Sequence, residues 1–146
     1  MQQIKWREEY SVGIPEMDAQ HRHMIELLAG LVKFTDSGGV VDPLTALAEV
    51  NRYAERHLQQ EEMMLRIRDY PEYVRHKAEH DEYRKKAAAL QARTRSRYFG
   101  AEITTFLVEW WRTHIVTSDQ QYARFFRSQS VDPATVNDQD PDDGEV

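Results

Sequence analysis

Apolar residues recur at helical spacing in four long stretches, and this pattern constrains the fold more than any other feature of the chain. The stretches run from residue 18 to about 35, from 43 to 65 or 66, from 71 to the mid-90s, and from 101 to about 127. Residues three or four apart share one face of a helix, so each stretch predicts a helix with one buried side. No sustained alternation with a period of two occurs, and we therefore expect no β-sheet.

Helix start and stop signals separate the four stretches. Asp18 has the side chain of a helix N-cap, and Asp42-Pro43 combines a cap with proline at the first helical position. Ser37-Gly38-Gly39 ends the first stretch, and Asp69-Tyr70-Pro71 separates the second from the third. Four helices with short connections predict an all-α fold, an antiparallel up-down-up-down four-helix bundle.

The two ends of the chain lack this pattern. Residues 1–17 contain Gly13 and Pro15 and predict an extended N-terminal arm, with the bundle spanning residues 18–127. Residues 128–146 contain almost nothing apolar, and six of the 25 acidic residues lie after Arg127. Such a segment cannot bury enough surface to offset its ordering entropy, so we expect a disordered acidic C-terminal tail.

Charge and composition exclude several classes of function. The net charge of -6 belongs to the tail, because residues 1–127 carry as many acidic as basic side chains, and a neutral body argues against nucleic-acid binding. No apolar run is long enough to span a membrane and the first residues show no secretory signal, so we expect a cytoplasmic protein with no membrane partner. The lack of cysteine excludes disulfides and thiolate metal sites.

The histidines are distributed over all four predicted helices. His57 precedes Glu61 by four residues, and His76 precedes His80 by four. Residues four apart lie one turn above each other on the same helical face. If these faces point inward, seven side chains can meet as metal ligands in the core: His21, His57, Glu61, His76, His80, His114 and Asp119.

Taken alone, His76 with His80 is weak evidence for a metal, and His57 with Glu61 is explained as well by an exposed ion pair. His23 points away from His21 and is expected at the surface. Five histidines and two acids in one core, however, would be costly to bury without a metal. His114 and Asp119 are five residues apart, about 140° around an ideal helix. Either a local distortion such as a π-bulge or an approach from opposite flanks would bring both to the site.

The donor types narrow the choice of metal. Imidazole and carboxylate suit iron, zinc, copper or nickel, and seven protein ligands are too many for one ion. If Glu61 and Asp119 bridge two octahedral ions together with one hydroxide, about eleven of roughly twelve coordination positions are filled. The open position on a ferrous ion could then take dioxygen. Because five of the seven ligands are neutral, such a site should favour reversible binding over oxygen insertion.

The same residues form motifs that resemble a known family. The shared positions, in chain order, are Trp6, Tyr10, Val12, Gly13, Asp18, Gln20, His21, His57, Glu61, Glu62, Tyr70, Pro71, His76, His80, Trp110, His114, Ile115, Asp119 and Tyr122. In combination they make residues 6–122 similar to the single-domain bacterial hemerythrins.

The resemblance implies two non-heme iron ions joined by carboxylate and oxo or hydroxo bridges. It assigns the saturated iron to His76, His80 and His114, the iron with the open position to His21 and His57, and the bridges to Glu61 and Asp119. It implies reversible dioxygen binding for storage, delivery or sensing rather than catalysis. Two alternatives remain open: a di-iron oxidase, peroxidase or nitric oxide reductase using the same residues, and a module that reports oxygen or iron to an unknown protein partner.

Trp111 departs from the family pattern, in which leucine is common at this position. It precedes His114 by three residues and therefore lies near the same helical face. Core packing is one explanation for the large ring. The alternative is that the indole lines the oxygen pocket and narrows the path to the two ions.

Overall fold

The computed structural model describes residues 3–38, 43–93 and 99–129, and every regular element within these ranges is helical. In chain order, the elements are the 3₁₀ turn η1 (Glu8–Tyr10), α1 (Pro15–Asp36), α2 (Pro43–Ile67), α3 (Tyr73–Ala92), α4 (Phe99–His114), the π-helical segment η2 (Ile115–Asp119) and α5 (Gln120–Gln129). The predicted all-α class is confirmed.

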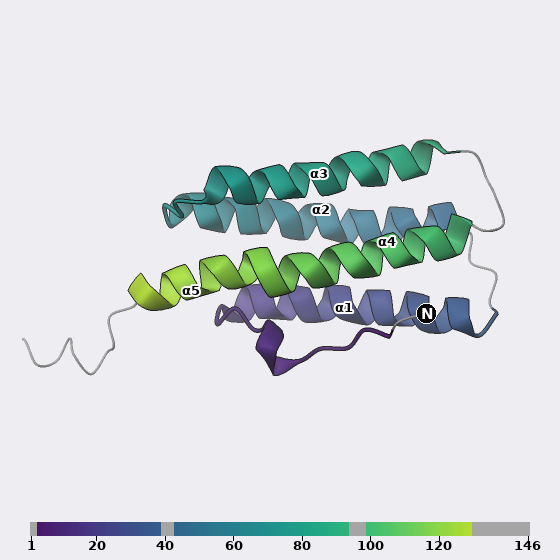
Figure 1. Cartoon of the computed structure of the whole chain (residues 1–146), viewed down its shortest axis with the longest axis horizontal. Coiled ribbons are helices and arrows are strands. Elements are labelled where there is room, and N and C mark those ends of the chain that lie inside the picture. Colours follow the sequence, from purple (N-terminus) through teal and green to yellow (C-terminus); the bar gives the residue numbers. More distant parts are fainter. Residues whose placement is uncertain (1–2, 39–42, 94–98, 130–146) are drawn as a thin grey trace, which may run out of the picture.

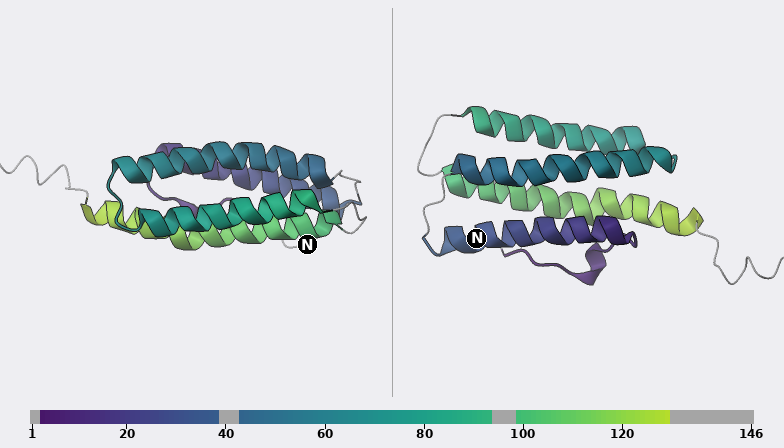
Figure 2. Two further views of the ribbon diagram at one scale, coloured as in Figure 1. Left: turned by 90° about the horizontal axis from the view of Figure 1, so that it is seen from above. Right: turned by 180° about the vertical axis from the view of Figure 1, so that it is seen from behind.

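The helices pack as an antiparallel four-helix bundle (Figure 1). Successive helices α1, α2 and α3 alternate in direction, and α4, η2 and α5 continue one another as the fourth rod. Two further views agree with the contacts between elements in placing α1 beside α2 and α4, and α2 beside α3 (Figure 2). This is the predicted up-down-up-down arrangement. None of the described helices combines the length and apolar character that crossing a membrane requires.

The first helix begins earlier than the sequence predicts. Its first residue is Pro15, after the extended residue Ile14, so Asp18 lies inside the first turn and is not the N-cap. Proline suits this position because its fixed φ is already helical and its missing N–H needs no partner there. The Asp18 carboxylate instead accepts hydrogen bonds from the Ser11 hydroxyl at 2.5 Å and the Val12 backbone N–H at 2.8 Å. Asp18 thus fastens the N-terminal arm to α1.

The turn between α2 and α3 is closed by Asp69, whose φ of 53° is in the left-handed region usually taken by glycine. The backbone N–H of Tyr70 donates to the carbonyl of Leu65, a bond that caps the end of α2. The sequence predicts that α3 begins at Pro71, but the helix begins at Tyr73. The fourth rod extends to Gln129, so residues 128 and 129 belong to α5 and not to the predicted tail. The rest of that tail and the predicted cap at Asp42 lie outside the described residues.

Two apolar clusters fill the core. The larger one runs along the bundle away from the α2–α3 turn and includes Leu28, Val32, Leu47, Leu107 and Trp111. The smaller one joins the arm to the opposite end of the bundle: Val12, Met17, Leu65, Tyr70, Tyr122 and Ala123. A layer of buried polar side chains lies in the half of the bundle nearest the α2–α3 turn.

Candidate metal centre

The seven predicted ligand residues converge in this polar layer. All are buried, and even the most accessible of them, His114, is only 3% exposed. Because the helices run antiparallel, the late part of one helix faces the early part of the next. Five elements contribute: α1 carries His21, α2 carries His57 and Glu61, α3 carries His76 and His80, α4 carries His114, and η2 carries Asp119.

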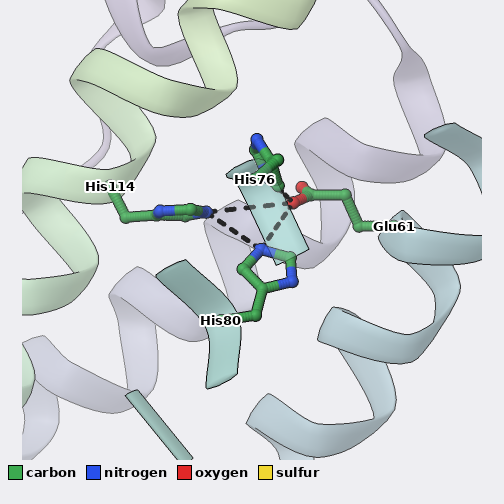
Figure 3. A group of neighbouring side chains, drawn as sticks. All are labelled: Glu61, His76, His80 and His114. Carbon is green, nitrogen blue, oxygen red and sulfur yellow. Dashed lines mark hydrogen bonds and ion pairs between the residues drawn. The ribbon is translucent and has the colours of Figure 1, made fainter. Parts of the chain in front are cut away.

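Three histidines, which we call the three-histidine group, face one oxygen of Glu61 (Figure 3). Oε1 of Glu61 lies 2.7 Å from Nε2 of His76 and 3.1 Å from Nε2 of His80. The same oxygen lies 3.9 Å from Nε2 of His114. The Nε2 atoms of His80 and His114 are 3.0 Å apart, so the ring nitrogens of this group meet at one point.

The two remaining histidines, the two-histidine group, face the other oxygen of Glu61. Oε2 lies 3.5 Å from Nε2 of His21 and 3.5 Å from Nε2 of His57. The two imidazole rings have their centroids 4.7 Å apart. The buried hydroxyl of Tyr122 donates a hydrogen bond to the same Oε2 at 3.0 Å, which fixes the direction of the carboxylate.

Asp119 repeats this division between the two groups. Its Oδ1 lies 3.2 Å from Nε2 of His76 and 3.1 Å from Nε2 of His114. Its Oδ2 lies 3.1 Å from Nε2 of His21. Asp119 and Glu61 therefore each direct one oxygen to the three-histidine group and the other oxygen to the two-histidine group.

The π-helical segment η2 explains how His114 and Asp119, five residues apart, can both face the cluster. In a π-helix the backbone hydrogen bonds join residues five apart, so those residues lie nearly above one another. With η2 spanning Ile115–Asp119, the Asp119 carboxylate reaches the same side of the rod as the His114 ring. The local distortion, and not an approach from opposite flanks, brings the two side chains together.

Three of the five imidazoles have a hydrogen-bond acceptor behind them, at Nδ1. The contacts are His80 to Glu62 at 2.9 Å, His114 to Glu79 at 3.1 Å and His57 to Gln20 at 2.6 Å. Such an acceptor keeps the proton on Nδ1 and turns the Nε2 lone pair toward the cluster. The sequence motifs include Glu62 and Gln20 without predicting these contacts, and they equally give no role to Glu79, which lies between His76 and His80. It contacts a histidine 35 residues away, and no local pattern links the two.

The two carboxylates of the cluster are held in the ionised form. Burial raises the pKa of Glu61, but the surrounding imidazoles, with His114 foremost, outweigh it and keep the pKa well below its usual value. Burial and the neighbouring Glu61 also raise the pKa of Asp119. His114 and His21 outweigh both effects, so this pKa too lies well below its usual value. The core of the bundle therefore contains two negative charges that attract cations.

The histidines respond to these charges in different ways. Burial lowers the pKa of His21 and His76, but contacts with Asp119 and Glu61 outweigh it and raise each pKa to about 9. For His57, burial dominates over the attraction of Glu61, and the pKa falls below its usual value. Positive charge is thus drawn to the points where the carboxylate oxygens lie.

The donor set fits metal ions. Nε2 of His21 and His57 and both oxygens of Asp119 are buried and make no well-aligned hydrogen bond among the described residues, even where they approach one another closely, although such atoms are nearly always hydrogen-bonded in native proteins. Two groups of mutually close ligand atoms share Glu61, one with three histidines and one with His21 and His57. Nitrogen and oxygen donors divided in this way suit two ions of the iron or zinc type.

Comparison with known proteins identifies the family. The sequence matches the family described as "Hemerythrin HHE cation binding domain" over residues 12–126. The chain belongs to the hemerythrin family. A bacteriohemerythrin of Clostridium acetobutylicum is 28% identical over 125 residues, covering 80% of this chain and 96% of the relative. A bacteriohemerythrin of Stenotrophomonas maltophilia is 31% identical over 127 residues, covering 82% of this chain and 79% of the relative.

Solved hemerythrin structures share the fold. The crystal structure of a point mutant of hemerythrin aligns with a TM-score of 0.69 at 23% identity, covering 85% of this chain and 97% of that one. The overlap includes most of the described bundle.

The structure separates His21 from His23, although the two are only two residues apart in the sequence. His21 is fully buried in the cluster, whereas His23 is exposed and its ring packs on Tyr53, with the centroids 4.4 Å apart. His23 therefore lies at the surface, as expected. Trp111 is fully buried, and its ring centroid is 5.7 Å from that of His57 in the two-histidine group.

Proposed function

We propose that the buried cluster holds two iron ions and that this site binds dioxygen reversibly. The observation that carries the proposal is that Glu61 and Asp119 each direct one oxygen to the three-histidine group and the other oxygen to the two-histidine group. Two carboxylates placed in this way can bridge two ions. One ion would then be held by His76, His80 and His114, and the other by His21 and His57.

The unequal number of histidines supports binding of a small ligand at one end of the site. With two bridging carboxylates in common, the two-histidine group offers one protein ligand fewer, so a coordination position there can stay free for dioxygen. Two ferrous ions would supply the two electrons that dioxygen takes up on binding and returns on release. Five neutral imidazoles leave the site less negative than a carboxylate-rich one, which supports reversible binding over oxidation of a substrate.

The chain's own residues would protect such a site from water. Trp111 is completely buried and lies against His57, where it would line the oxygen pocket. Tyr122 is also completely buried, with its hydroxyl on Oε2 of Glu61 and its ring packed against His76 at a centroid distance of 5.5 Å. A dry, fixed environment slows the irreversible oxidation of ferrous iron and keeps the bridging carboxylate in place.

The test is a gas-exchange cycle on protein expressed in iron-replete medium. We expect metal analysis to find two iron ions per chain, and the reduced protein to gain visible absorption bands in air and lose them under argon. One-way oxidation with release of peroxide would instead indicate a di-iron oxidase. Iron content near zero, or zinc in its place, would contradict the proposed cofactor.

A matched pair of variants makes the assignment of the residues testable. His76→Ala removes a histidine that contacts both bridging carboxylates, and it should abolish the visible bands and reduce the iron content. His23→Ala removes an exposed histidine outside the cluster and should leave both unchanged.

A further inference from the structure

We propose that the two metal positions fill in a fixed order, the three-histidine position first. Carboxylates accept hydrogen bonds from Nδ1 of histidines at that position, whereas only a neutral amide accepts one at the two-histidine position. The inference rests on the proposed function, since it takes the cluster to bind two ions. It concerns four residues outside the ligand set: Glu62, Glu79, Gln20 and Gln60.

Carboxylates stand behind two members of the three-histidine group. Nδ1 of His80 donates to Oε2 of Glu62 at 2.9 Å, and Glu62 is itself held by Arg84 at 2.7 Å. Nδ1 of His114 donates to Oε2 of Glu79 at 3.1 Å. The Ser118 hydroxyl donates to the same oxygen of Glu79, and Arg75 contacts the other oxygen at 3.1 Å. Both carboxylates are therefore fixed in position by further partners.

A neutral amide takes this place in the two-histidine group. Nδ1 of His57 donates to Oε1 of Gln20 at 2.6 Å, and the Gln20 amide N–H₂ donates to Oε1 of Gln60. Nδ1 of His21 is buried and has no hydrogen-bond partner within the described parts of the chain. His76 in the other group shares this feature. The groups thus differ in the charge of the acceptors behind their anchored histidines.

This difference affects metal affinity in a known direction. An anionic acceptor at Nδ1 makes the imidazole a stronger donor at Nε2 and holds its ring in the binding orientation, and loss of such a partner typically weakens metal binding by about 10- to 100-fold. A neutral amide orients the ring but adds less to its donor strength. Together with the extra histidine, this makes the three-histidine position the tighter of the two.

Solvent reaches the residues behind both groups, since a pocket of about 620 Å³ is lined by Glu62, which stands behind His80. A surface pocket of about 310 Å³ between α1 and α2 extends to the two-histidine side, where it is lined by Gln20, His23, Tyr53, Arg56, His57 and Gln60. A chelator or a proton reaching this pocket meets the Gln20–Gln60 pair directly behind His57. Because both sides can be reached, the order of release follows the affinities, and the ion at the proposed dioxygen position should be the first to leave.

The experiment is a titration of the full-length chain with Co²⁺ under argon, followed by visible absorption and calorimetry. We expect two binding steps, the first tighter by roughly tenfold or more. Glu79→Gln keeps an acceptor for His114 but removes its charge, and it should weaken the first step by about tenfold while leaving the second unchanged. Glu82→Gln removes an exposed charge from the same helix and should change neither step.

A second variant gains function and so cannot be explained by misfolding. Gln20→Glu places a carboxylate behind His57, and the amide of Gln60 can rotate to donate to it. This change should strengthen the second step and bring the two affinities together. Two equal steps in the parent, or a Gln20→Glu variant with an unchanged second step, would overturn the proposed order. Failure of the proposed metal site looks different, because then Co²⁺ would bind no better to the parent than to His76→Ala.

Iron release provides an independent reading. When iron-loaded protein is challenged with a ferrous chelator under argon, iron should leave in two phases of equal amplitude, and Gln20→Glu should slow the faster one. A single phase that responds equally to Glu79→Gln and Gln20→Glu would contradict the inference.

Discussion

The two halves of the bundle core are built from the same four helices and follow opposite rules. In the half away from the α2–α3 turn, apolar side chains such as Leu47 and Leu107 are completely buried, and their packing needs no further partner. In the other half, five imidazoles and two carboxylates fill the same space. Burial stabilises the first half directly, whereas in the second it is costly unless charges are matched.

The comparison shows how a polar layer can be tolerated in a small protein. The layer is covered on its outer end by the smaller apolar cluster, in which Val12 from the arm packs with Tyr70 and Tyr122. Asp18 fastens the arm in this position through Ser11 and Val12. The polar layer is thus enclosed by apolar packing at both ends. Apolar packing stabilises one part of the core directly, whereas the other part contains the candidate metal ligands.

The strongest way to separate the two halves is to remove the metal. If free metal is present at about a thousandfold above its dissociation constant, each bound ion stabilises the folded state by about 4 kcal/mol. Chelation of iron from the loaded protein should therefore lower the free energy of unfolding by at least this amount, as measured by urea denaturation followed by circular dichroism. An unchanged denaturation midpoint would mean that the polar half does not depend on metal.

A cavity in the apolar half should have the next largest effect. Leu107→Ala removes a completely buried side chain and should lower the free energy of unfolding by about 3 kcal/mol. If the two halves act independently, the loss should be equal in loaded and chelated protein, and iron content should not change. Ile67→Ala is the control, since Ile67 is 74% exposed and its truncation should cost less than about 0.5 kcal/mol. A Leu107→Ala protein that also loses its iron would show that the halves are coupled.

The features that could be predicted from the sequence are those with a local or additive pattern. Helical periodicity is local, so the four rods were predicted with boundaries close to the observed ones. Pairs four residues apart, such as His57 with Glu61 and His76 with His80, point the same way on any helix, so their convergence with His21 in one core was also predictable.

The features that could not be predicted depend on contacts between distant segments. The side chain of Asp18 suits an N-cap, but Pro15 takes the start of the helix and the arm folds back to meet Asp18. The spacing of His114 and Asp119 is compatible with a local distortion and with an approach from opposite flanks, and only the packed structure, with its π-helical segment η2, decides between them. Glu79 reaches His114 only in the packed bundle, so its place behind the site was missed.

Trp111 lies where the two halves meet, and replacing it tests the boundary. Its ring faces His57 on the polar side and Tyr83 on the apolar side, with centroid distances of 5.7 Å and 5.4 Å. Trp111→Leu leaves a cavity at this point and should lower the free energy of unfolding by about 2 kcal/mol. If the indole also narrows the path to the two ions, the dioxygen on-rate or the autoxidation rate should rise several-fold in stopped-flow and visible-absorption measurements.

The neighbouring tryptophan distinguishes gating from loosening of the bundle. Trp110 is half-buried and stacks on His114 of the three-histidine group, with ring centroids 4.6 Å apart and planes 13° from parallel. Trp110→Leu should also reduce stability, but it opens no space beside His57 and should leave the dioxygen on-rate unchanged. If Trp111→Leu leaves both rates within error of the parent, the indole serves packing alone. If both variants speed dioxygen binding equally, loosening of the bundle explains the effect, and Trp111 does not by itself control the path of dioxygen to the two ions.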